Sequence, residues 1–179
     1  VCMVRHPDCE PVTLPLVLGR REHSDGVPPG STTPRPLRLP PRGSIGADEC
    51  FVPEGWAWLG GDPDASLCLP RQRVWVDAFV ARRFPVTNKE YLAFLDDLVA
   101  TGQAERAQAL APRERAGTEG ADGASIFGFD GKRFFLRPDA DGDVWEPDYP
   151  ITMVNWDGAM AYAGWLAART GLPWRLPSE

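Results

Sequence analysis

One stretch of the sequence, residues 150–173, most constrains the fold, because it holds the signals for a strand, a capped helix and a helix stop in succession. Residues 151–154 form a short apolar run behind a proline, which is typical of a buried strand. Asn155 follows and can accept hydrogen bonds from the free amides of a first helical turn. An apolar stripe then continues at helical spacing until Gly171 and Pro173 end it. We therefore predict a strand over 151–154 and an amphipathic helix that starts after Asn155.

The apolar stripe of this helix consists of Ala159, Tyr162, Ala163 and Leu166. Three tryptophans accompany it, and we interpret them as core anchors rather than as a ligand cage: Trp156, Trp165 and Trp174. Gly158 stands where a Glu or Gln side chain would reach back to the cap and complete a capping box. We therefore expect this helix start to be weaker than one with a complete box.

A complete capping box occurs earlier in the chain, where Thr87 is followed three residues later by Glu90. The stripe behind it predicts a helix that ends at Gly102, and it consists of Tyr91, Leu92, Leu95, Leu98 and Val99. Asn88 is the one polar residue of this motif that we consider as a functional candidate. The alternative role for its amide is to tie down a neighbouring loop.

Four further elements are predicted: a strand over 11–18, a strand over 73–80, a helix over 104–110 and a hairpin over 127–136. Pro15 indicates that the first strand lies at a sheet edge. Side chains alternate strictly along the second strand, with valines and an alanine on one face. The hairpin is indicated by the turn at Asp130 and Gly131 between two aromatic runs.

Three loop segments invite functional interpretations that the residues do not support. The Gly-Gly pair at 60–61 is interpreted as a tight turn, because no Gly-Lys-Ser/Thr of a phosphate loop follows it. Residues 117–123 are a Gly-rich insertion. Residues 139–143 are Asp-rich, but Val144 and Pro150 occupy the positions where a calcium-binding loop needs Gly and Glu. We predict a turn there.

Composition bounds the fold class and the partners. A hydrophobic content of 43% with seven Trp supports a packed core, while 19 Pro and 18 Gly among 179 residues exclude long regular elements. We therefore expect an α+β fold with little regular secondary structure. The net charge is −6 and no run of Lys or Arg occurs, so nucleic acid and anionic membrane surfaces are not expected partners.

The cysteines match no zinc or redox spacing, and they are Cys2, Cys9, Cys50 and Cys68. We expect them to be buried or half-buried thiols in a reducing, cytoplasmic compartment. Residue 1 is Val, and no apolar run approaches membrane-spanning length, so we assign no signal peptide or membrane segment.

Three motifs in order carry a resemblance to a known family. They are CFVPEGWAWLGG at 50–61, FPVTNKEY at 84–91, and PITMVNWDGAMAYAGWL at 150–166 with RLPSE at 175–179. This pattern resembles the formylglycine-generating-enzyme (sulfatase-modifying factor) family. The resemblance implies a formylglycine-generating-enzyme fold, which is a C-type-lectin-like α+β domain, over 48–179. Residues 1–25 are then the tail of a small β-rich module, and 26–47 form a Pro/Gly-rich linker.

The resemblance also implies a function. The family activity is oxidation of a sulfatase cysteine to formylglycine by a metal-dependent oxidoreductase, which makes a protein or peptide the expected substrate. Copper and calcium are expected in the complete domain. Since the chain stops inside the RLPSE motif, we expect it to hold only the N-terminal half of the domain. We assign no catalytic, cofactor-binding or metal-binding residue in it.

A second interpretation stays open. The chain resembles domains in multidomain bacterial proteins that also carry a serine/threonine protein kinase. The domain would then be a non-catalytic binding or regulatory module of a signalling protein. The sequence does not decide between an enzyme and such a module.

Overall fold

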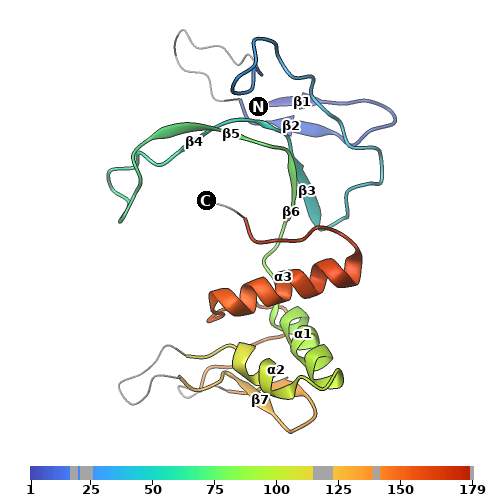
Figure 1. Ribbon diagram of the computed structural model, residues 1–179, viewed down its shortest axis with the longest axis vertical. Coiled ribbons are helices and arrows are strands. Elements are labelled where there is room, and N and C mark those ends of the chain that lie inside the picture. The colour runs from blue at the N-terminus through green and yellow to red at the C-terminus, as the bar shows by residue number, and fades with distance from the viewer. Residues whose placement is uncertain (17–19, 21–25, 115–122, 139–141, 178–179) are drawn as a thin grey trace. The chain divides into compact units, whose positions relative to one another are not determined.

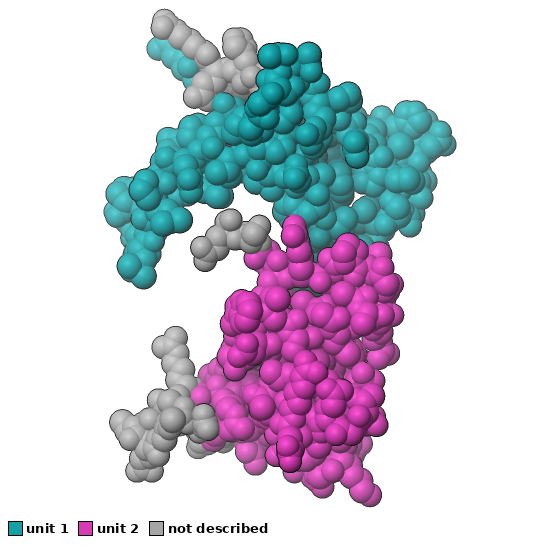
Figure 2. Space-filling model, viewed as in Figure 1, with its two compact units in different colours: residues 1–84 teal, residues 85–179 magenta. Residues whose placement is uncertain are grey.

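The computed structural model describes residues 1–16, 20, 26–114, 123–138 and 142–177. The chain forms two compact units, Val1–Phe84 and Pro85–Glu179 (Figure 2). Strands make up the regular structure described in the first unit, whereas the second combines helices with a hairpin (Figure 1). Most of the predicted Gly-rich insertion at 117–123 and of the Asp-rich turn at 139–143 lies outside the described residues.

The described residues of the first unit form three antiparallel strand pairs: β1 (Cys2–Val4) with β2 (Val12–Leu14), β3 (Glu49–Val52) with β6 (Phe79–Arg82), and β4 (Gly55–Leu59) with β5 (Gln72–Val76). The predicted strand over 11–18 is therefore confirmed over 12–14, and its last two residues lie outside the described residues. β2 ends before Pro15, which has no N–H to donate to a ladder.

The single strand predicted over 73–80 is wrong, because this run is divided between β5 and β6. Asp77 and Ala78 lie outside both strands. The partner strands β3 and β4 are separated at the same level by Pro53 and Glu54. Proline cannot donate a ladder hydrogen bond, and the two halves of the run pair with different strands on either side of it.

The second unit contains α1 (Asn88–Ala100), α2 (Ala104–Leu110), the hairpin of β7 (Phe127–Phe129) and β8 (Phe134–Leu136), and α3 (Trp156–Thr170). All three predicted helices and the hairpin are confirmed. Apolar side chains from every one of these elements form the core: Tyr91, Phe94, Leu95, Leu98, Ala107, Ile126, Phe127, Phe134 and Tyr162. Asp96 fixes the hairpin to α1, since its carboxylate accepts the N–H of Phe134 at 2.7 Å.

The hairpin turn forms at Asp130 and Gly131, as predicted. The Asp130 carboxylate accepts the backbone N–H groups of Lys132 at 2.8 Å and Arg133 at 2.9 Å. These two hydrogen bonds favour the charged form, with that of Arg133 contributing most, and lower the pKa of the carboxyl. Gly131 has φ +90°, a conformation that residues with a side chain rarely adopt.

Residues 151–154 do not form the predicted buried strand. The Ile151 N–H donates to Val86 O at 2.8 Å, and one bridge pairs Thr87 with Pro150, but the pairing goes no further. Met153 has φ +58°, which turns the backbone out of the extended conformation. Thr152 and Met153 are exposed, so apolar composition alone did not indicate burial.

The predicted capping box at the start of α1 is confirmed. The Thr87 hydroxyl accepts the Glu90 N–H at 3.3 Å, and the Glu90 carboxylate accepts the Thr87 N–H at 2.8 Å. At the start of α3 the Asn155 side chain accepts the Gly158 N–H at 2.8 Å. Gly158 has no side chain to return a hydrogen bond, so this cap satisfies fewer backbone amides.

We expect Thr87→Ala to lower the free energy of unfolding by about 1 kcal/mol, because it removes the acceptor for a helical amide and one side of the box. Asn155→Ala should cost less. Urea denaturation of both variants measures the ranking. An equal or reversed order would contradict the assignment of the complete box to α1.

Candidate functional site

The only polar residue considered as a functional candidate, Asn88, is fully buried and holds a loop. Its side-chain Nδ2 donates to Glu146 O at 2.8 Å, and its backbone N–H donates to Tyr149 O at 2.9 Å. The neighbouring Lys89 N–H donates to Pro147 O at 2.9 Å. The alternative role predicted for this amide, to tie down a loop, is thus confirmed. Asn88 Oδ1 is buried without a hydrogen-bond partner.

The crossing of α1 and α3 is built around Gly158. A Cβ at this position would lie 2.6 Å from the Tyr91 hydroxyl oxygen and 2.9 Å from a methyl of Val154. Tyr91 has no room to withdraw, since it is 1% exposed and its hydroxyl donates to Leu110 O at 2.9 Å. The same burial raises the pKa of Tyr91 above its ordinary value. Tyr91 therefore leaves no room at position 158 for the acidic side chain that would complete the capping box.

The three tryptophans predicted as core anchors of this region differ in burial. Trp165 is half-buried, packs on Phe94 and donates its indole N–H to Asp97 at 2.9 Å. Trp174 is also half-buried. Trp156 is 69% exposed, so the prediction is wrong for this residue. Its position in the first turn of α3 faces away from the core, whereas Tyr162 and Ala163 face inwards.

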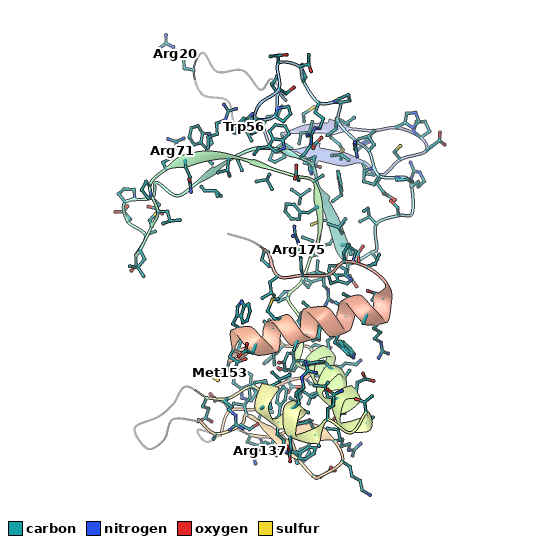
Figure 3. The ribbon with its side chains drawn as sticks, in the orientation of Figure 1. Arg20, Trp56, Arg71, Arg137, Met153 and Arg175 are labelled. Carbon is teal, nitrogen blue, oxygen red and sulfur yellow. The ribbon has the colours of Figure 1, made fainter. Side chains whose placement is uncertain are left out.

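In the first unit, arginines and tryptophans share one face of the β4–β5 pair, which we call the arginine–tryptophan face. Its members are Trp56, Trp58, Arg71, Arg73 and Trp75. Figure 3 labels two of these residues, Trp56 and Arg71. The register places Trp56 opposite Trp75 and Trp58 opposite Arg73. Because side chains on a strand alternate between faces, these residues all project to the same side.

On this face, arginines near the start of β5 stack on the tryptophans of β4. The Arg73 guanidinium lies 4.8 Å from the ring centroid of Trp56, and the Arg71 guanidinium lies 4.2 Å from that of Trp58. The rings of Trp56 and Trp75 meet edge to face at 5.7 Å between centroids. Each cation over an indole face contributes about 0.5–1 kcal/mol at exposed sites.

Two further contacts hold the face in place. The Trp56 indole N–H donates to Val27 O at 2.9 Å, which fixes the central ring. The tight turn predicted at 60–61 is wrong: these glycines begin the loop that joins β4 to β5, and the Gly61 N–H donates to Leu69 O at 2.9 Å. Both glycines have positive φ, and a Cβ on Gly61 would lie 2.5 Å from that of Arg71. Glycine is therefore required here so that the backbone before β5 can pass close to Gly61.

One comparison with known families decides what kind of domain these elements form. The sulfatase-modifying factor enzyme 1-like domain matches residues 39–179. The chain belongs to this family. The match includes the arginine–tryptophan face and all three helices of the sulfatase-modifying factor domain. No curated protein matches the chain.

The thiols of the sulfatase-modifying factor domain and its flanking segment are free. Cys9 and Cys50 are half-buried, as predicted, but Cys2 and Cys68 are exposed, which contradicts the expectation. Cys68 lies in the loop between β4 and β5.

Copper and calcium are the ions that the family resemblance implies. Among the described residues, no three His, Cys, Asp or Glu side chains come together as a metal site requires. We derive no chemistry through either ion. None of the described helices has the length and apolar character needed to cross a bilayer.

Proposed function

We propose that the domain takes part in the family's reaction, the oxidation of a sulfatase cysteine to formylglycine, and that the described residues supply its scaffold rather than its reacting groups. Membership of the family over 39–179 carries the proposal. The substrate is then a polypeptide that presents a cysteine. Copper and calcium belong to the complete domain in this proposal, and no described residue is assigned to them.

The use of the motif residues supports the scaffold role. The side chains of Thr87 and Glu90 accept hydrogen bonds from each other's backbone N–H groups, and Asn88 is buried in the core. Asn155 is engaged in capping α3. A side chain that is buried in the core or hydrogen-bonded to the backbone is poorly placed to exchange protons or electrons with a substrate.

The test is conversion of a peptide with the sequence Cys-x-Pro-x-Arg by the full-length gene product, with copper, a reductant and dioxygen as the oxidant, followed by mass spectrometry. We expect the mass of the peptide to fall as its thiol is replaced by an aldehyde, and no change with heat-denatured protein. A full-length product that binds the peptide but never converts it would contradict the proposed reaction.

The scaffold role is tested separately in the same assay. Replacing the described thiols one at a time, with Cys2→Ser, Cys9→Ser, Cys50→Ser and Cys68→Ser, should leave the rate of conversion unchanged. Loss of conversion in any variant that melts like the parent would assign that thiol to the reaction and overturn the scaffold role.

A further inference from the structure

We propose that the arginine–tryptophan face binds an acidic, extended polypeptide segment whose carboxylates stand at alternate positions. The proposal does not depend on whether the domain oxidises a cysteine.

Charge complementarity is the first reason. Arg71 and Arg73 are exposed, and within the described part of the chain their side chains make no hydrogen bond and no ion pair. Arg35, which lies over Trp75, is different: it contacts the Glu54 carboxylate at 2.6 Å and that of Asp77 at 3.8 Å. Two uncompensated guanidinium groups thus stand together in a chain whose net charge is −6.

Spacing is the second reason. Trp56 and Trp58 are two residues apart on β4, and each has one of the two guanidinium groups over its ring. Strand geometry places such positions about 6.6 Å apart. An extended peptide presents every second side chain on one face with the same spacing. Carboxylates at alternate positions therefore meet both guanidinium groups in register, and the flat fork of arginine can take a carboxylate through two N–H groups.

The stacking favours a carboxylate-bearing peptide over a nucleic acid. Single-stranded nucleic acids are held by bases that stack on exposed aromatic rings. Here Trp56 and Trp58 each already have an arginine over the ring. The stacking also limits the rotation of the two arginines, so less side-chain entropy is lost when a carboxylate binds.

The experiment compares two fluorescent peptides of the same length and composition, one with Glu and Thr alternating and one with Glu-Glu and Thr-Thr blocks. Binding to the full chain is followed by fluorescence anisotropy at low salt. We expect the alternating peptide to bind roughly tenfold more tightly, because the block peptide can place a carboxylate opposite only one guanidinium at a time. Raising the salt concentration should weaken both.

Variants identify the face. The double variant R71Q/R73Q should lose the roughly tenfold preference for the alternating peptide. The double variant R71K/R73K should lose most of it too, because Lys keeps the charge but has no planar fork to stack. The matched control is Arg35→Gln, which removes an arginine that is already paired and should leave the preference unchanged.

Equal binding of the two peptides by the unmodified chain would overturn the proposal without any variant. An unaltered preference in R71Q/R73Q or in R71K/R73K would overturn it as well. Tighter binding of single-stranded RNA than of the alternating peptide, with the same loss in R71Q/R73Q, would assign the face to nucleic acid instead.

Discussion

Phe94→Ala is expected to lower the free energy of unfolding by about 4 kcal/mol, the largest single effect that we predict. Phe94 is 1% exposed at the centre of the second unit. Its ring centroid lies 5.3 Å from that of Tyr91 and 5.7 Å from that of Tyr162, and both pairs meet edge to face. Truncation removes these contacts and leaves a cavity between α1 and α3 that the surrounding rings are too rigid to fill.

Urea denaturation of the full chain, followed by circular dichroism, gives the difference. The control is Met160→Ala on α3, which is 41% exposed before the change and should cost less than about 1 kcal/mol. Equal effects of the two substitutions would show that Phe94 does not lie in the core described above.

Gly158→Ala is expected to destabilise the protein by about 2 kcal/mol, although the same substitution in an open helix position stabilises by about 1 kcal/mol. The added methyl would lie 2.6 Å from the Tyr91 hydroxyl oxygen and 2.9 Å from a carbon of Val154. The helices must then separate or Tyr91 must give up its hydrogen bond to Leu110.

A matched control is available on the same helix. A Cβ on Gly164 would meet nothing within 4 Å, so Gly164→Ala should stabilise. In a Tyr91→Phe background the clash with the hydroxyl is absent, and the cost of Gly158→Ala should fall. Thermal melts of the parent, Gly158→Ala, Tyr91→Phe and the double variant of these two residues provide a double-mutant cycle. A stabilising effect of Gly158→Ala in the parent chain would contradict the packing of α1 on α3.

The parts of the fold that could be predicted are those with local causes. A cap at Thr87 and a stop at Gly102 act within a few residues of themselves, and so do the Asp130 turn and the left-handed Gly171. Such signals are readable without knowledge of distant contacts. The family resemblance rests on the same local motifs, and it is confirmed at the level of the domain by the match over 39–179.

The parts that could not be predicted depend on pairing across the sequence. Alternation over 73–80 does not reveal that its two ends have different partners, because the alternating pattern of the sequence runs through residues 77–78 without interruption. The exposure of Trp156 is set by how α3 sits on α1. The arginine–tryptophan face arises only when the register brings Trp56 and Trp58 beside Arg73. In the sequence, the residues of this face alternate as in any other strand, so nothing there singles them out.

The anchoring of residues 146–151 by the start of α1 has a consequence for the order of events during synthesis. The capping box needs only residues 87–90 and can form as soon as they leave the ribosome. Asn88 obtains its partner Glu146 only 58 residues later, which is several seconds at usual elongation rates. Until then a polar side chain destined for the core stays hydrated, so α1 can form early but its packing must wait for the loop.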